Sequence, residues 1–551
     1  MRLLLARVAL DDSMPVVMNT PPPSVFSKVG DTPLAWGTVA GIALGATYAL
    51  SPVSVWLLIA IAGLLVWVGC SLTGRERRWV MGILTIGVVL RVLMIALLFL
   101  GSEAVDCGWA TRTPLGTGDL QLPAWINVQI GQQSSKEAPE KQPYALWDRY
   151  SDYVWPSCSS LTVGTDHYVN FFWDGDGRAL KRRAGSIQNI WLGIPVDPFL
   201  RSVAWEPYAM TSYLYVLAYI QYLLGPAPYA IHLINVVAFF ASTLLLYRLV
   251  RSTYGRAAAL VGLVLLVFLP TPFAWSVSVM KESVYVLLGA FGMVAAVAML
   301  RANSLIKRIV ALFLFIGAMP VVETVRVGGG LILGTGLGAG VAGGVIIRRV
   351  SLMLLAFLLV PYAGYRVLGN ASVQDRIMSQ LRASGSVHLG HVRTEGNTYK
   401  LLDQRFYTSV KNTSAGTMTP VKELETMTPV EALRFSGRAL GYFVVAPLPW
   451  QVRSKIEVMF LPQQVVWYLM VVLAAIGVVA GLRRDPLVTC LLCGVTVAGS
   501  VAIALNSGNI GTMVRHRDTV VPFVVWLSAL GAVTTASNWM SRATPGTLDS
   551  E

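Results

Sequence analysis

The sequence predicts an all-α integral membrane protein with about twelve transmembrane helices. Of its 551 residues, 55% are hydrophobic and only 13% are charged, whereas soluble domains carry about 25% charged residues. The mean hydropathy is +0.61. Apolar runs of about 17–23 residues recur along the chain, which is the length that crosses a hydrocarbon core of about 30 Å. Most of the chain is therefore expected to face lipid or other helices rather than water.

Twelve apolar runs define the predicted spans. They cover residues 34–50, 53–70, 79–100, 228–247, 257–279, 283–300, 306–322, 328–347, 350–368, 463–481, 486–505 and 518–538. The short first pair could instead form a hairpin that does not fully cross the membrane. The predicted segments are a disordered tail at 1–33, spans 1–3 at 34–100, a loop at 101–227, spans 4–9 at 228–368, a loop at 369–462, spans 10–12 at 463–540 and a tail at 541–551.

Basic clusters follow the even-numbered spans. They comprise Arg75, Arg77 and Arg78; Arg248, Arg251 and Arg256; Arg301, Lys307 and Arg308; Arg348 and Arg349; Arg483 and Arg484; and Arg542. Because Lys and Arg gather on the cytoplasmic side of membrane proteins, both termini are predicted to be cytoplasmic and both long loops extracytoplasmic. This pattern accounts for the net charge of +14 without nucleic acid as a partner. We therefore expect a multi-pass protein of the cytoplasmic membrane.

Both loops contain helix signals. Residues 208–224 are apolar and aromatic, and we predict an interfacial helix there, because a span would reverse the side of every later basic cluster. In the second loop, Thr428 can cap a helix that has Pro429 at its first position and Glu431 in its first turn. That helix is predicted to run through Arg438 and to end before Pro447, where the chain is expected to re-enter at the headgroup level.

Cysteines and glycines give structural signals. Cys107 and Cys158 share the first loop and could form a disulfide or remain two free thiols. Cys490 and Cys493 lie within an apolar run, where we predict small buried side chains rather than a metal or redox pair. Glycines repeat every four residues in two series, which predicts close helix packing. These are Gly330, Gly334 and Gly338, and Gly336, Gly340 and Gly344.

The first candidate site is a pair of acids in the first loop. Asp174 and Asp176 are separated by one glycine and follow three aromatic residues. An aromatic neighbourhood partly desolvates a carboxylate and raises its pKa, which suits a general base. The same Asp-x-Asp spacing could hold a divalent cation, the one candidate cofactor. Alternatively, the Asp-Gly sequence could form a simple turn.

Three further clusters of charge lie at predicted external ends of spans. Lys281 and Glu282 follow the prolines at 270 and 272, and could be a pair that reaches to the interface. Glu323 and Arg326 are three residues apart and are expected to pair on one helix face. Arg515, His516 and Arg517 are basic residues on the side that the positive-inside rule disfavours. They could bind an anionic ligand such as a phosphate or pair with external acids.

The stretch from 213 to 291 resembles the multi-spanning GT-C glycosyltransferases, especially bacterial exopolysaccharide and protein-mannosyltransferase-like members. The resemblance rests on an ordered series of short motifs: Tyr-Leu-Leu-Gly-Pro at 222–226, His232 to Asn235, Leu-Tyr-Arg at 246–248, Tyr-Gly-Arg at 254–256, Leu-Pro at 269–270, Trp275 and Lys281-Glu282. Residues 509–523 and Pro-Leu-Pro-Trp at 447–450 are similar to further elements of that family. The matching patches cover about half of the chain, and each alone is weakly specific.

The resemblance implies a lipid-linked sugar transferase of the cell envelope, active in polysaccharide biosynthesis. Its donor would be a polyprenyl-phosphate sugar, and its acceptor a glycan, a lipid or a protein. An acid of the first loop, by position Asp174 or Asp176, would act as general base in an inverting transfer. The basic group at 515–517 would bind the lipid phosphate, assisted by Lys281 or Arg326, and Glu282 would belong to the same substrate-binding set. The chain departs from the family because about seventy residues separate this acid pair from the preceding span, so Glu103 and Asp106 are alternatives.

Two other functions remain open from the sequence. An O-antigen-type polymerase or ligase would also use external arginines and a lipid-linked sugar. A transporter or flippase of a polar lipid or anion would place ionisable residues near the middle of the membrane and show internal repeats. No repeat relates the two halves of this sequence, and its candidate charges lie at the ends of spans, which favours the enzyme.

Overall fold

The computed structural model is built from helices. It describes residues 52–106, 174–193, 211–224, 230–393, 397–408, 422–451 and 455–543, together with positions 41, 196 and 201. Within these residues every regular element is a helix, and the one β-type pairing is an isolated bridge between Thr398 and Asn509. The predicted all-α membrane class is thus confirmed for the described part of the chain.

The chain divides into two compact units. Unit 1 comprises Met1–Ala241 and Ala274–Val284, and unit 2 comprises Ser242–Phe273 and Tyr285–Glu551. The helices of unit 1 are α3 (Pro52–Ser71), α4 (Gly74–Asp106), α7 (Asp174–Trp191), α9 (Ser212–Leu224) and the short η1 (Ala230–His232). Three helices contribute residues to both units: α10 (Leu233–Tyr254), α12 (Pro270–Val277) and α13 (Glu282–Arg301).

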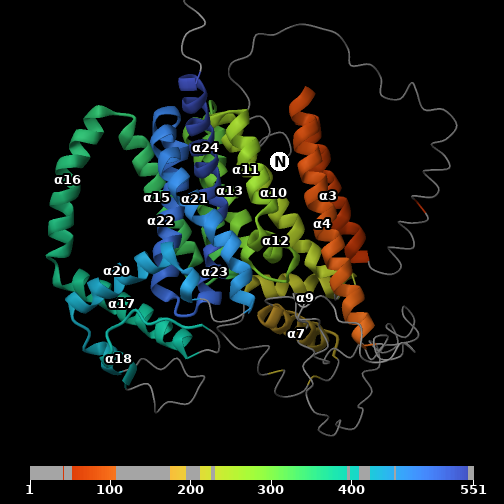
Figure 1. Cartoon of the computed structure of the whole chain (residues 1–551), viewed down its shortest axis with the longest axis horizontal. Coiled ribbons are helices and arrows are strands. Elements are labelled where there is room, and N and C mark those ends of the chain that lie inside the picture. The colour runs from red at the N-terminus through yellow and green to blue at the C-terminus, as the bar shows by residue number, and fades with distance from the viewer. Residues whose placement is uncertain are drawn as a thin grey trace, which may run out of the picture. The chain divides into compact units, whose positions relative to one another are not determined.

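Unit 2 holds the remaining elements. They are α11 (Arg256–Phe268), α14 (Leu305–Val325), α15 (Gly329–Ile347), α16 (Val350–Leu368), α17 (Ala371–Val392), α18 (Arg405–Thr408), α19 (Lys422–Glu425), α20 (Pro429–Val445), η3 (Pro449–Gln451), α21 (Lys455–Arg484), α22 (Pro486–Asn506), α23 (Ile510–Arg517) and α24 (Val521–Ala543). Figure 1 shows α16 standing apart from α15 and α22, and none of its apolar stretch is buried.

Ten described helices are long and apolar enough to cross a membrane, and α11 with α12 forms one further, bent candidate. They correspond to every predicted span except 34–50, which lies outside the described residues apart from position 41. The predicted span 257–279 is broken, with a bend of 59° between α11 and α12. The break falls at Pro270, which has no N–H to donate and disfavours helical backbone at the residue before it.

Helices are present at both of the places predicted within the loops, and their position at the membrane surface stays a prediction. Helix α9 covers most of 208–224 and is only 13 residues long, too short to span a bilayer. Helix α20 begins at Pro429 with the predicted capping box, in which Thr428 and Glu431 bond reciprocally, and ends before Pro447. Its level relative to the membrane surface stays a prediction.

Glycines allow three pairs of helices in unit 2 to approach closely through their backbones. A β-carbon added to Gly336, Gly340 or Gly344 of α15 would lie within 2.8 Å of the backbone of α22. This confirms the second glycine series as a packing surface. In the first series, a β-carbon on Gly330 would lie 2.7 Å from the backbone carbonyl of Met319 in α14, and one on Gly334 would meet the side chain of Met319, whereas nothing lies within 4 Å of Gly338. A third backbone contact joins α21 to α24.

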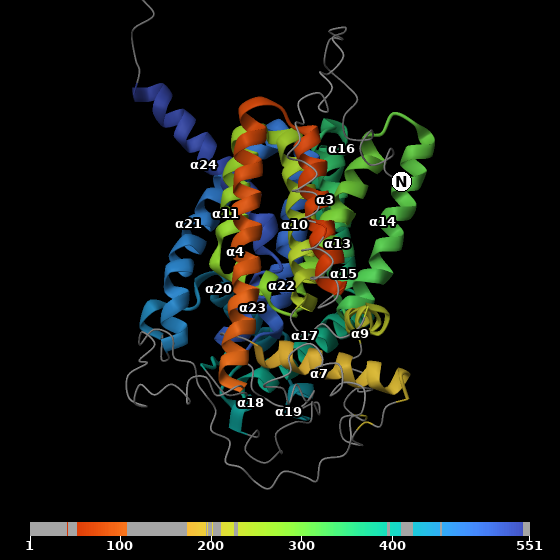
Figure 2. The ribbon, with the colours of Figure 1, turned by 90° about the vertical axis from the view of Figure 1, so that its right-hand side faces the viewer.

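One end of unit 2 gathers the junctions that follow even-numbered predicted spans. Asp485, between α21 and α22, accepts from Arg301 at the end of α13 (2.5 Å) and lies 3.5 Å from Arg348 at the end of α15. Arg484 donates to the carbonyl of Tyr254 at the end of α10. We call this the Asp485 end. Helices α17 and α18 lie at the opposite end of unit 2, where α16 ends (Figures 1 and 2).

Candidate functional site

A buried arginine, Arg517, lies at the end of unit 2 opposite the Asp485 end. It is the last residue of α23 and only 4% exposed. Its guanidinium donates to the carbonyls of Phe443 and Ala446, both at 2.6 Å, and to the side-chain oxygen of Gln464 at 2.9 Å. The guanidinium carbon also lies 4.8 Å from the ring centroid of Trp467. Such contacts let a buried cation be satisfied by dipoles and an aromatic face.

The carbonyls that Arg517 binds belong to the C-terminal end of α20. A helix leaves its last four carbonyls without partners inside the helix. Here side chains satisfy all of them, since Trp467 donates to Val444 at 3.0 Å and Tyr468 donates to Val445. Arg517 binds the other two. We call this set of contacts the α20 clamp. It accounts for the burial of Arg517 without a carboxylate partner, and a cation is favourable at a helix C-terminus.

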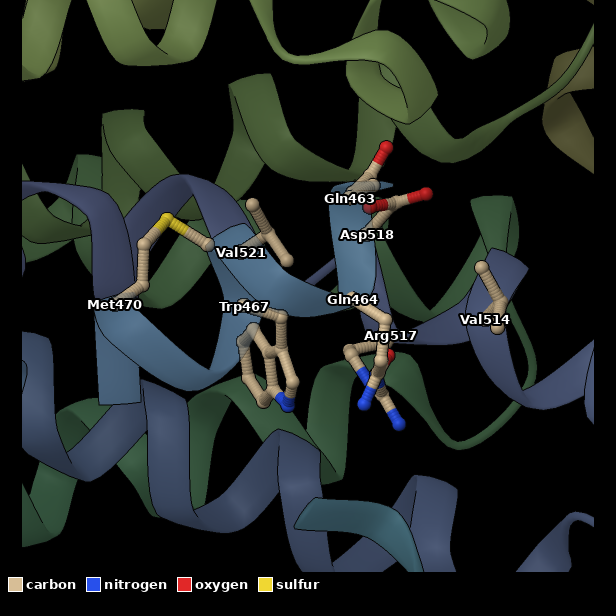
Figure 3. A pocket seen from close by; sticks show the side chains of 8 residues that line it. All are labelled: Gln463, Gln464, Trp467, Met470, Val514, Arg517, Asp518 and Val521. Carbon is tan, nitrogen blue, oxygen red and sulfur yellow. The ribbon is translucent and has the colours of Figure 1, made fainter. Parts of the chain in front are cut away.

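Asp518 lies beside the clamp and forms a separate polar group. Its carboxylate accepts from the hydroxyl of Thr271 at 2.5 Å, and the amide of Gln463 donates to the same hydroxyl. Figure 3 shows Asp518 and Gln463 side by side, with the guanidinium of Arg517 directed to the other side. A cavity of about 10 Å³ separates them, enough for roughly one water molecule. The Nε of Arg517 is buried and has no partner among the described residues.

Two histidines of α17 hold the connection between α22 and α23. His388 is fully buried; its Nδ1 donates to the carbonyl of Ser507 at 2.6 Å, and its Nε2 accepts from the hydroxyl of Tyr407 at 3.0 Å. His391 contacts the carbonyl of Asn506 in the same way at 2.7 Å. Burial lowers the pKa of His388 to about 4, so the ring is neutral at physiological pH. These contacts fix the segment that leads to Arg515, His516 and Arg517.

Unit 1 contains a second polar cluster around the turn between α12 and α13. Arg91 of α4 is fully buried and donates to the hydroxyl of Ser276 at 2.6 Å. Asn235 of α10 donates to the carbonyls of Ser278 and Met280, both at 2.5 Å. An arginine at the centre of a membrane-spanning helix costs about 2.5–3.5 kcal/mol by insertion scales, so a polar cluster here needs a reason.

The predicted acid pair begins a helix rather than a turn. Asp174 is the first residue of α7, and Asp176 lies in its first turn. Their side chains lie outside the described residues, so the base and the cation alternatives both stay predictions. Helix α7 packs on α9, where Trp191 meets Tyr215, Tyr219 and Tyr222.

The other predicted site residues have different surroundings. Lys281 is half-buried in the turn after α12, and Glu282 is buried at the start of α13. Glu323 does not pair with Arg326, contrary to the expectation; it accepts from the backbone N–H groups of Gly328 and Gly330 at 2.7 and 3.0 Å. The amides at the start of α15 attract a carboxylate, which explains the difference. Arg326 lies over the ring of Tyr285 instead. Arg515 and His516 are half-buried on α23.

Metal-binding groups of three or more His, Cys, Asp or Glu are absent from the described residues. Cys490 and Cys493 lie half-buried on α22, and Cys490 borders the glycine contact with α15. The possible disulfide of the first loop, Cys107 with Cys158, lies outside the described residues.

Arg91 and His388 are not among the predicted site residues. Arg91 interrupts an apolar run of α4, and a lone arginine inside a span is a signal that could have been used. His388 lies in a polar stretch and gives no comparable signal, because its partners are remote in sequence. Ser507, for example, is 119 residues away.

Comparison with known proteins adds no relative. No protein-family model, curated protein or solved structure matches this chain.

Proposed function

We propose that the protein is a membrane glycosyltransferase of the GT-C type. It transfers a sugar from a polyprenyl-phosphate donor to a glycan, lipid or protein acceptor on the extracytoplasmic face of the cytoplasmic membrane. The motif order from 213 to 291 supports the sugar-transferase class. In this proposal both termini are cytoplasmic and the Asp485 end of unit 2 faces the cytoplasm.

The observation that carries the proposal is the contrast between the two ends of unit 2. At the Asp485 end, basic residues follow the positive-inside pattern and gather on one acid. At the opposite end, Arg515, His516 and Arg517 run against that pattern. The clamp on α20 accounts for the burial of Arg517. Arg515 and His516 are half-buried on the same helix, and a lipid phosphate at the membrane edge has the charge and location to interact with such a basic group.

The proposed roles follow from this division. Arg515 and His516 bind the donor phosphate and stabilise the negative charge that develops on the leaving group. Asp174 or Asp176 acts as general base toward the acceptor hydroxyl and gives inversion at the anomeric carbon. Both acids lie in the first turn of α7, where the helix dipole favours an ionised carboxylate. A divalent cation bound by this acid pair is the one candidate cofactor, and a chelator tests it.

Arg91 supports one alternative function. An ionisable residue buried inside a span is typical of transporters and flippases as well as of enzymes. Transport of a polar lipid or anion would therefore be the next function to test if transfer is not observed.

The deciding experiment measures transfer of radiolabelled sugar from polyprenyl-phosphate donors by purified full-length protein in nanodiscs. Wild type is compared with Asp174→Asn and Asp176→Asn, with and without a chelator. Loss of transfer by about 100-fold or more in one variant identifies the base. Absence of transfer from every donor, with substrate-dependent uptake in vesicles, overturns the proposal in favour of transport.

Arg515 and Arg517 should behave differently. Arg515→Ala should lower transfer more strongly than it lowers thermal stability, because its proposed role is to bind the donor phosphate. Arg517→Ala should destabilise the protein by about 3 kcal/mol or more, since it leaves two buried carbonyls of α20 unsatisfied. Arg349→Ala, at the exposed Asp485 end, is the matched control and should change neither property. Equal stability of the Arg517 variant and wild type would contradict the clamp.

A further inference from the structure

The end of α12 and the turn that leads to α13 are held by three buried side chains from other elements. Arg91 binds Ser276, and His232 contacts the carbonyl of Val277 at 2.5 Å. Asn235 binds the carbonyls of Ser278 and Met280. Because a carbonyl only accepts, the Nδ1 of His232 must carry a proton, which fixes its tautomer. Residues 276–280 are therefore restrained at four of five positions.

Asn235 is the central residue of this arrangement. Its amide nitrogen donates both protons to the turn, and its oxygen accepts from the hydroxyl of Tyr213 at 3.3 Å. Tyr213 and Asn235 are both buried. Burial raises the pKa of Tyr213, the hydrogen bond to Asn235 partly offsets this, and the nearby Glu282 raises the pKa.

The restraint acts directly on Lys281 and Glu282, which follow the turn. Glu282 is the first residue of α13 and is 3% exposed, so its direction is set by the backbone that precedes it. Adjacent residues at a helix start point in different directions. Lys281 can therefore contact a phosphate oxygen through its ammonium group, while the carboxylate of Glu282 accepts a hydrogen bond from a sugar hydroxyl. Such preorganisation typifies a substrate-binding element.

We propose that Asn235, assisted by Arg91 and His232, is a positioning residue that holds Lys281 and Glu282 against the phosphate-linked sugar of the donor. This inference rests on the proposed function for its substrate, but the restraint itself can be measured without any transfer assay.

Hydrogen exchange tests the restraint in the full-length protein. Asn235→Asp keeps the size of the side chain but removes both donors, so the amides of 278–283 should exchange at least about tenfold faster than in wild type. Tyr213→Phe removes only the bond to the asparagine oxygen and should have a smaller effect. Peptides of α22 serve as the control for general destabilisation and should be unchanged. Unchanged exchange at 278–283 overturns the positioning role.

A double-mutant cycle tests whether Asn235 acts through Glu282. Asn235→Asp and Glu282→Gln should each lower kcat/KM for sugar transfer by about tenfold or more, and the double variant should be little worse than either alone. Tyr254→Phe, which removes a hydrogen bond to Thr489 in unit 2, should combine additively with Glu282→Gln. Additive effects of Asn235 and Glu282 would overturn the inference.

The two proposals fail in different ways. If exchange at 278–283 rises in Asn235→Asp but wild type transfers no sugar, the restraint stands, whereas the proposed function and the sugar contact of Glu282 both fall. If transfer occurs and exchange is unaffected, the transferase stands and the positioning role falls.

Discussion

His388 illustrates how a single buried residue can tie several segments together. Its two ring nitrogens connect α17 to Ser507 and to Tyr407. The hydroxyl of Tyr407 in turn accepts from the backbone of Leu401 and Leu402. The geometry requires a neutral ring, because the Nε2 accepts a hydrogen bond. Protonation would remove that acceptor and place a charge in a buried position.

The buried, neutral ring of His388 predicts that the protein loses stability at acidic pH. The folded pKa of His388 is about 4, below the ordinary value of 6.5. Its stabilising contribution is therefore complete above about pH 6.5 and is lost as the pH falls toward 4. At pH 5 the loss is about 2 kcal/mol. Thermal unfolding at pH 7.5 and pH 5 should show a larger decrease for wild type than for His388→Gln. The same decrease in both proteins would refute the role of this histidine.

Residue-scale sites were only partly predictable from sequence. The basic group at 515–517 was recognised because it violates a simple rule of charge distribution. The sequence did not predict that Arg517 is buried in the α20 clamp and so differs from Arg515 and His516. The carbonyls that bind Arg517 come from α20, more than 70 residues earlier in the chain. Arg91 and Ser276 are separated by 185 residues. Patterns within a span report its length and exposed faces, but they do not name the remote partner of a buried polar group.

At the scale of elements, the two glycine series of α15 show what spacing can and cannot predict. Both series predict close packing, but they meet different helices: Gly336, Gly340 and Gly344 meet the backbone of α22, whereas Gly330 meets the backbone of α14. The spacing identifies a smooth helix face, and the neighbour that uses that face depends on the whole arrangement. Helix starts and breaks were more predictable, since the cap at Thr428 and the break at Pro270 depend on local chemistry.

A matched pair of substitutions tests the contact between α15 and α22. A β-carbon at Gly340 would lie 2.6 Å from the α-carbon of Leu491, whereas nothing lies within 4 Å of Gly338. Gly340→Ala should therefore destabilise the protein by about 1–3 kcal/mol, and Gly338→Ala should be close to neutral. Thermal unfolding in one detergent compares the two variants. A neutral Gly340→Ala would show that the helices do not meet as described.

At the scale of the whole molecule, the ends of unit 2 give the strongest link between sequence and structure. The sequence predicted that basic junctions would share one side of the membrane. In unit 2 the ends of α10, α13, α15 and α21 meet near Asp485. The agreement arises because helices that alternate in direction bring every second junction to the same end. The side of the membrane to which that end belongs is a prediction.

Cysteine labelling can establish the orientation. Arg349 lies exposed at the Asp485 end, and Leu433 lies exposed on α20. In intact cells a membrane-impermeant maleimide should label Leu433→Cys, whereas Arg349→Cys should react only after permeabilisation. The five native cysteines are first replaced so that no other thiol reacts. Labelling of both positions from the same side would contradict the predicted topology.

The backbone contacts between helices have a mechanical consequence. Besides the contact of α15 with α22, Gly477 of α21 and Gly531 of α24 each approach a carbonyl of the facing helix. Contacts of this kind contain no side-chain rotamers that could adjust to a sliding movement. We therefore expect each pair to move as one rigid body. Movement of one helix relative to the rest of unit 2 would then be easiest for α16, whose apolar stretch is unburied throughout.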